Sequence, residues 1–161
     1  MLAVASVVGL GLATAAAAAP ARTAKLTPAE TTWVTPVVKL WNTLNAGLLV
    51  VVSQATAKEA LLVGTKNNGK LNATLASFVT CNQTLKKPGA APARLAKFGG
   101  SMKNACTDLE AGAHDFAKAI RAINKGNDTL GQKLVIQGVG EFRQSSAKLA
   151  AARKQLLAVS G

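Results

Sequence analysis

The sequence predicts an all-α protein, an up-down-up-down four-helix bundle preceded by an N-terminal apolar helix of the signal type. Apolar residues recur at three- and four-residue steps in four long segments, which is the spacing of one helix face. No stretch shows sustained alternation of apolar and polar residues, the pattern of a half-buried strand. Glycine and proline fall between these segments more often than within them, and the short connections make sequential helices antiparallel.

Residues 1–18 are expected to be a secretory signal peptide. This stretch is apolar and uncharged, and its small residues suit cleavage between Ala18 and Ala19. A signal peptide usually has a positive charge before its apolar segment, but no Lys or Arg precedes this one. Either the amino terminus alone supplies the charge, or the start codon is misassigned and a basic leader is missing from the sequence. An uncleaved anchor is the alternative, but the segment is short and Ala-rich, and Arg22 and Lys25 follow it directly. Export with cleavage is therefore favoured.

The remainder of the chain is expected to be one domain. Residues 19–26 are interpreted as a spacer and residues 27–161 as a single helical-bundle domain. A domain of that length buries enough apolar surface for a core without a structural metal.

The first helix has the clearest start in the chain. Thr27-Pro28-Ala29-Glu30 combines an N-cap threonine, a proline at the first helical position and a glutamate at the third. Pro36 should kink this helix, or else Thr35-Pro36 is the true start; the helix is expected to reach Val63. No residue between Lys39 and Lys58 is charged, but asparagine, threonine, serine and glutamine make this stretch too polar for a membrane span. A core helix is the better interpretation.

Three further helices are expected at about 70–86, 102–124 and 129–158. Lys125-Gly126 should close the third, with the glycine in the C′ position, and Asn127-Asp128 should cap the fourth. The fourth helix carries large apolar residues at heptad spacing: Val135, Phe142, Leu149 and Leu156.

The only two cysteines, Cys81 and Cys106, fall on the apolar stripes of the second and third helices. Both thiols should therefore point into one core. We predict a disulfide, which fits an exported protein, and two unpaired core thiols are the alternative.

The rise along each helix tests this disulfide. If the third helix began at Pro92, its cysteine would lie ~21 Å along it, against ~8 Å for the cysteine of the second helix, and no bond would form. If Ser101 caps that helix after Gly99-Gly100, both cysteines lie ~7 Å from the hairpin end. We therefore predict a break at Gly99-Gly100 together with the disulfide, and a loop at residues 87–100 with one helical turn at 92–97.

The net charge of +12, from 19 basic and 7 acidic residues, predicts an anionic partner. The basic residues are densest around the loop just described, and five of them are candidate contacts: Lys86, Lys87, Arg94, Lys97 and Lys103. No nucleic-acid reader motif or set of stacking aromatics accompanies them, so specific nucleic-acid binding is not expected. The expected partner is an anionic envelope polymer, a lipid headgroup or an acidic protein; a merely solvated basic surface is the alternative.

Catalytic and metal-binding patterns are scarce. His114 is the only histidine, and Glu110 lies one turn before it, but a bundle di-metal site needs two Glu-x-x-His pairs, and the sequence has none. We expect an edge-of-core histidine paired with Glu110, and neither a metal nor a cofactor. The sequence has no Gly-x-Ser-x-Gly elbow and no phosphate-cradling glycine loop, so a non-enzymatic protein is expected.

The fourth helix places Gly138 and Ser145 on its inward stripe, where large residues are expected. One interpretation is a cavity for a small apolar ligand, with five candidate lining residues: Trp41, Phe116, Gly138, Phe142 and Ser145. The favoured interpretation is close helix approach against a bulky partner such as Trp33 or Trp41. The sequence thus predicts an exported, non-enzymatic bundle of the cell envelope or medium, secreted or periplasmic, that binds an anionic partner, with a carrier of an apolar ligand as the alternative.

Overall fold

The computed structural model describes residues 25–55 and 69–160. This part of the chain is mostly helical and contains no strand, which confirms the all-α prediction. Its elements are α1 (Pro28–Ala55), α3 (Gly69–Val79), α4 (Cys81–Lys86), the 3₁₀ turn η1 (Ala93–Leu95), α5 (Ala96–Asn124) and α6 (Asp128–Ser160). The predicted signal peptide, its cleavage point and most of the spacer lie outside the described residues, as does the predicted end of the first helix at Val63.

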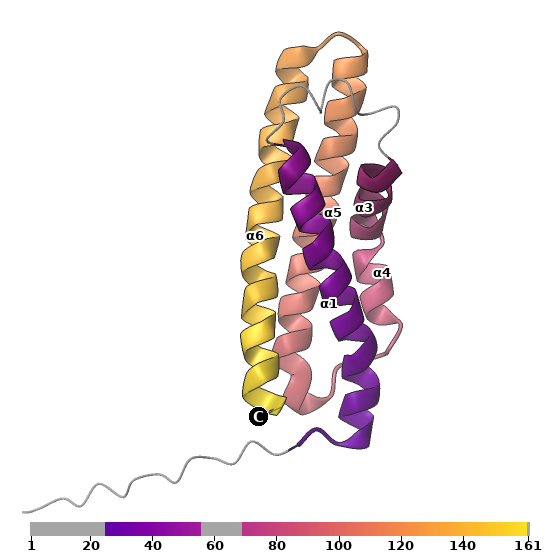
Figure 1. Cartoon of the computed structure of the whole chain (residues 1–161), viewed down its shortest axis with the longest axis vertical. Helices are drawn as coiled ribbons and strands as arrows, with labels where there is room; N and C mark the ends of the chain where they lie inside the picture. Colours follow the sequence, from indigo (N-terminus) through magenta and orange to yellow (C-terminus); the bar gives the residue numbers. More distant parts are fainter. Residues whose placement is uncertain (1–24, 56–68, 161) are drawn as a thin grey trace, which may run out of the picture.

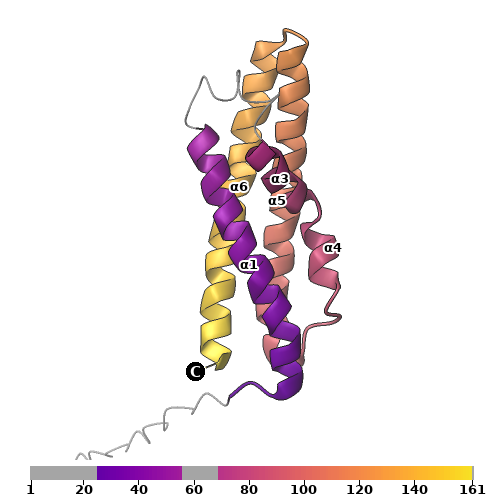
Figure 2. The same ribbon diagram turned by 45° about the vertical axis from the view of Figure 1, so that its right-hand side comes forward.

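The helices lie side by side along one long axis (Figures 1 and 2). In Figure 1 α1 runs up the view, α3 and α4 return downwards, α5 runs up, and α6 runs down to the C-terminus. Helices α5 and α6 form the most extensive pair and extend at the top of both views beyond α1 and α3. Helices α3 and α4 together form a shorter rod that packs on α5 and α1.

One hydrophobic core joins all of these helices. Its centre is aromatic, because the ring of Phe142 lies 5.3 Å from that of Phe116 and 5.4 Å from that of Phe78. The largest fully buried side chains come from every helical segment: Leu44, Phe78, Cys81, Leu95, Phe98, Met102, Leu109, Phe116, Phe142 and Leu149. The apolar stripes predicted for these segments therefore face the core.

The predicted helix ends at Thr27 and Gly126 are confirmed by their hydrogen bonds. The backbone N–H of Thr27 donates to Glu30 Oε2 at 2.8 Å, and the N–H of Glu30 donates to Thr27 Oγ1 at 3.2 Å, which is a reciprocal capping box. Gly126 has a positive φ of 76° and ends α5, as a C′ glycine does. The N–H of Leu130 donates to Asn127 Oδ1 at 3.1 Å, so Asn127 caps α6.

Helix α1 starts at Pro28 and runs through Pro36, so the alternative start at Thr35-Pro36 is wrong. Pro36 is exposed, and water can satisfy the carbonyl that its missing N–H leaves without a partner. By length and mean hydropathy, 1.3, residues Pro28–Val51 reach the values of a membrane span, so composition does not exclude one. Packing favours a core helix instead: six side chains of α1 are buried in the core, whereas its exposed face carries mostly threonine, asparagine and lysine.

The helix predicted over 70–86 is interrupted at Thr80, between α3 and α4. The hydroxyl of Ser77 donates to the carbonyl of Thr74 at 2.7 Å, and that of Thr80 donates to the carbonyl of Ala76 at 3.1 Å. Such hydroxyls compete with backbone N–H groups for helix carbonyls and bend the helix locally. Cys81 is the first residue of the helix after the bend.

Cys81 and Cys106 form a disulfide with their Cα atoms 5.3 Å apart. The break predicted with it is wrong, because α5 begins at Ala96 and passes unbroken through Gly99-Gly100. The predicted break requires the second and third helices to meet at one level. Instead, the chain after Lys86 continues along the bundle before α5 begins, and this connection takes up the difference in height (Figure 1). The predicted helical turn within residues 92–97 corresponds to η1 and the start of α5.

Candidate functional site

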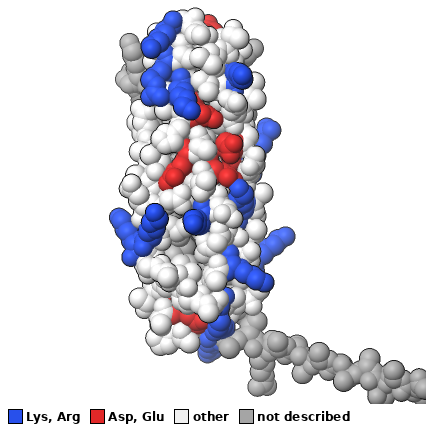
Figure 3. Space-filling view, turned by 180° about the vertical axis from the view of Figure 1, so that it is seen from behind, with Lys and Arg blue, Asp and Glu red and all other residues white. Residues whose placement is uncertain are grey.

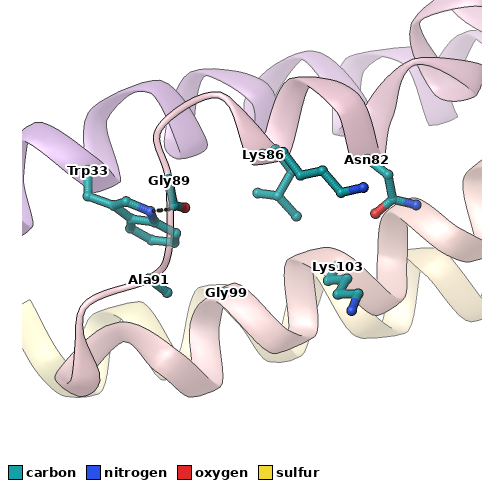
Figure 4. A pocket seen from close by; sticks show the side chains of 8 residues that line it. Trp33, Asn82, Lys86, Gly89, Ala91, Gly99 and Lys103 are labelled. Atoms are coloured by element: carbon teal, nitrogen blue, oxygen red, sulfur yellow. Dashed lines mark hydrogen bonds between the residues drawn. The ribbon is translucent and has the colours of Figure 1, made fainter.

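A groove of about 210 Å³ opens between α4, the connection that follows it, and the first half of α5 (Figure 4). Residues from α1, α4, the connection and α5 line it: Trp33, Asn82, Leu85, Lys86, Gly89, Ala91, Gly99 and Lys103. Figure 4 shows Trp33, Gly89, Ala91 and Gly99 toward one end, and Lys86, Asn82 and Lys103 toward the other. The groove therefore has an apolar end and a basic end.

The apolar end is fixed by contacts between distant parts of the chain. The indole N–H of Trp33 donates to the carbonyl oxygen of Gly89 at 3.1 Å and ties the connection to α1. Gly89 itself has φ +84°, a conformation that side chains disfavour. The Trp33 ring also meets Phe98 edge-on, with centroids 6.1 Å apart. These contacts hold the wall of the groove in one place.

Gly99 makes room for the apolar end. A Cβ atom built there would lie 3.0 Å from the Cβ of Ala91 and 3.3 Å from the indole of Trp33. A Cβ on the neighbouring Gly100 would meet nothing within 4 Å. The groove therefore depends on the missing side chain of the first of these two glycines.

The basic end carries two ammonium groups without acidic partners. Lys86 comes from α4 and Lys103 from α5; both are exposed, and neither forms an ion pair within residues 25–55 and 69–160. The backbone N–H and side-chain amide of Asn82 donate to Glu110, at 3.1 and 3.0 Å. Glu110 is therefore held by Asn82, and the two lysines are left facing water.

A second groove, of about 260 Å³, lies on the other side of α4, toward α1. It is lined by Pro36, Val37, Leu40, Thr84, Leu85, Lys87 and Pro88. Leu85 lines both grooves, so the end of α4 forms a ridge with a lysine on each side, Lys86 and Lys87.

The five basic residues expected to contact an anion have different surroundings. Lys86 and Lys103 share the first groove, Lys87 lines the second, and Lys97 is exposed in the first turn of α5. Arg94 instead has a structural role. Its guanidinium contacts Glu30 at 3.1 Å and donates to the carbonyl of Val159 at 3.2 Å, so it joins the start of α1 to the end of α6.

Glu30 is the acidic partner in this contact, and its side chain is only 7% exposed. The backbone N–H of Thr27 is the main cause that lowers the pKa of Glu30 from its ordinary value. The Thr27 hydroxyl and the positive charge of Arg94 act in the same direction, against the opposing effect of burial. The carboxylate is thus held ionised at the junction of α1, η1 and α6.

The residues expected to line an apolar cavity in α6 are packed against α5. A Cβ on Gly138 would lie 2.6 Å from the ring of Phe116, and one on Gly112 would lie 2.6 Å from the ring of Phe142. The buried hydroxyl of Ser145 donates to the carbonyl of Ala105 at 3.0 Å. Close helix approach accounts for Gly138 and Ser145, with Phe116 as the bulky partner instead of Trp33 or Trp41.

Trp41, the remaining residue of that set, lies at a different place. Its indole N–H donates to the carbonyl of Leu149 at 3.0 Å. Its ring lines a shallow groove of about 170 Å³ between α1 and α6, together with Val38, Phe98, Arg153, Leu156 and Leu157.

His114 is exposed, and its expected partner Glu110 is bonded to Asn82. The pairing predicted between these two side chains is therefore wrong. Within the described ranges, no three or more histidine, cysteine, aspartate or glutamate side chains gather where they could hold a metal ion.

Charge alone does not locate a site. Seen from behind, Lys and Arg are spread along the whole length of the molecule, while Asp and Glu gather mainly in its upper half (Figure 3). In the region around α4, two grooves are lined by lysines that form no ion pair within residues 25–55 and 69–160. Comparison with models of protein families, with curated proteins and with solved structures finds no match for this chain.

Proposed function

We propose that this protein is an exported, non-enzymatic up-down-up-down bundle that binds an anionic partner in the cell envelope or medium. The binding region is the α4 surface, defined by Lys86, Lys87, Lys97 and Lys103. The observation that carries the proposal is that Lys86 and Lys103, from two different helices, line one groove without acidic partners among the described residues. An anion bound there is attracted by the positive charges of both lysines.

The compartment is supported by the disulfide. A disulfide between Cys81 and Cys106 is typical of an oxidising compartment, because the cytosol keeps most thiols reduced. The apolar N-terminal segment of the sequence is consistent with export.

Binding is favoured over catalysis by the state of the acidic groups. Glu30 pairs with Arg94, Asp108 with Lys148, Asp115 with Lys118, and Glu110 accepts two hydrogen bonds from Asn82. The other two acidic residues that the structure describes, Asp128 and Glu141, form no ion pair there, and neither lines one of the three grooves. The unpaired charge that remains near the grooves is cationic.

The test is binding to vesicles that contain phosphatidylglycerol, and to a sulfonated resin, as salt is raised. We expect retention at low salt and its loss between about 0.1 and 1 M, as the Debye length falls from about 10 to about 3 Å. Replacing the four lysines of the α4 surface by glutamine should move the loss to lower salt. A control with equal charge change, at the exposed residues Lys70, Lys125, Lys133 and Lys154, should move it much less. No retention of the natural protein at low salt, or equal shifts in both variants, would contradict the proposal.

A carrier of a small apolar ligand is the second candidate. The groove beside Trp41 supports it, because nearly all of its lining is apolar. Native mass spectrometry of protein purified from its own host should then show a bound small molecule that is lost on replacing Leu157, a 57% exposed lining residue, by glutamine. Ligand-free protein in that experiment would count against a carrier.

A further inference from the structure

The groove lined by Trp33 and Lys86 differs at its two ends, and this difference indicates what kind of anion it takes. We propose that it binds a small organic anion that carries one apolar group, such as a short-chain phosphate ester or carboxylate. This inference rests on the proposed function, that the lysines of the α4 surface bind anions, and adds the chemical class of the ligand.

The apolar end suits a short chain or a ring. Trp33 is 6% exposed, and its indole N–H is already bonded to Gly89, so the ring offers the groove carbon atoms and no free donor. Leu85 and Ala91 are half-buried, and Gly99 contributes no side chain. A hydrocarbon group placed here leaves water without forfeiting a hydrogen bond of the protein.

The basic end suits the anionic head of the same molecule. Lys86 on α4 and Lys103 on α5 both line this end of the groove. In Figure 4 the ammonium of Lys86 is directed toward Asn82, whereas the side chain of the exposed Lys103 points away from Lys86 and must turn to contact the head. The side-chain amide of Asn82 donates one of its two hydrogens to Glu110, so it offers the head at most one further donor, and the charge of the head is bound by the lysines. The carboxylate of Glu110 accepts two hydrogen bonds from Asn82, which lines this end, and these bonds reduce its repulsion of an incoming anion.

Size and rigidity limit the ligand. A volume of about 210 Å³ is below the range of about 300–1,000 Å³ typical of sites for drug-sized molecules, so a head with a short chain or single ring is the fitting size. The disulfide holds α4 on α5, and the Trp33–Gly89 hydrogen bond holds the connection on α1. The walls of the groove are therefore preorganised, which lowers the entropic cost of binding.

The experiment is an NMR titration of the folded protein with three probes: hexyl phosphate, inorganic phosphate and hexanol. The indole N–H signal of Trp33, assigned with a Trp33→Phe variant, reports the apolar end. We expect hexyl phosphate to shift this signal and to bind about tenfold or more tighter than inorganic phosphate, because burial of two methylene groups suffices for that factor. Hexanol should bind more weakly than hexyl phosphate by a similar factor.

Variants at exposed positions assign the site. Lys86→Gln and Lys103→Gln should each weaken hexyl phosphate about fivefold or more, through loss of a charge-assisted contact. Lys125→Gln, the same change at the opposite end of α5, should leave the affinity nearly unchanged. Gly99→Leu should block the apolar end and weaken hexyl phosphate but not inorganic phosphate, whereas Gly100→Leu, which points into open space, should do neither.

The outcomes separate this inference from the proposed function. If hexyl phosphate binds no tighter than inorganic phosphate, or hexanol binds as tightly as hexyl phosphate, the two-ended ligand is wrong while anion binding by the α4 surface stands. If Lys86→Gln and Lys103→Gln have no larger effect than Lys125→Gln, the groove is not the site. If no probe binds and anionic vesicles do not retain the protein, the proposed function fails as well.

Discussion

The indole N–H of Trp33 donates a hydrogen bond to the carbonyl oxygen of Gly89, 56 residues further along the chain. This contact joins the first helix to the connection between α4 and α5. It shapes both the fold and the groove, because the same ring packs edge-on against Phe98 and lines the apolar end.

Trp33→Phe keeps an aromatic ring but removes the N–H donor. We expect a loss of about 1 kcal/mol in unfolding free energy for the hydrogen bond, with an added cost for the smaller ring. Amide exchange of the Gly89 region should rise more than exchange in the α5–α6 pair, because the connection loses its tie to α1. Urea denaturation and hydrogen exchange measure the two effects, and equal acceleration of exchange throughout the protein would contradict the local role.

The disulfide closes a loop of 25 residues between Cys81 and Cys106. In the chain-entropy model, such a loop stabilises the fold by ~3 kcal/mol. Cys81→Ser should therefore lower the unfolding free energy markedly, and adding Cys106→Ser should cost little more, since the bond is already lost. Urea denaturation tests this, and a reductant should affect the natural protein but not the double variant. Losses that add fully would instead indicate two independent core thiols.

Much of the helical layout could be predicted from the sequence, because it depends on local patterns. The capping box at Thr27 and the C′ glycine at Gly126 are encoded within a few residues, and the structure shows both. The start of α5 could not be read in this way. Two helical glycines cost about 1 kcal/mol each relative to alanine, which favours a break. Burial of Leu95 and Phe98, which are 0% and 1% exposed, offsets that cost and carries the helix through the glycines.

The groove was harder to predict than the helices, because its residues come from four separate parts of the chain. Local charge density in the sequence points to Lys86 and Lys103, and both residues line the groove. Nothing near Trp33 in the sequence indicates that it contacts Gly89. The sequence pattern predicts a helix break at Gly99, whereas in the structure this residue is helical and its lack of a side chain leaves room for the groove. Arg94 belongs to the same basic segment, but the buried Glu30 holds it in a structural contact.

Two glycines in α6 should respond oppositely to alanine. A Cβ at Gly138 would lie 2.6 Å from the Phe116 ring and 3.0 Å from the backbone oxygen of Gly112, so α5 and α6 must separate. Gly138→Ala should therefore destabilise the protein by about 1–3 kcal/mol. Gly140 is helical and a Cβ there meets nothing within 4 Å, so Gly140→Ala should stabilise by up to about 1 kcal/mol. Thermal denaturation of the pair checks this, and stabilisation by Gly138→Ala would mean that the helices are not in close contact there.

Glu30 should make stability depend on pH in the acid range. Its pKa in the folded protein is lowered, chiefly by the Thr27 backbone N–H, whereas in the unfolded chain it returns to about the ordinary 4.5. Below that value the unfolded state binds the proton more readily, so the stabilisation is fully present above pH 4.5 and is lost as the pH falls through the folded pKa. Glu30→Gln should lower the melting temperature at pH 7. It should also weaken the fall of the melting temperature as the pH is lowered below 4.5.

Glu141→Gln is the matched control, since Glu141 forms no ion pair within the described ranges. The melting temperature of this variant should fall with pH as it does in the natural protein. If the melting temperature of Glu30→Gln falls at acid pH as steeply as that of the natural protein, other carboxylates cause the pH dependence. The contacts among Thr27, Glu30 and Arg94 would then have no role in stability at acid pH.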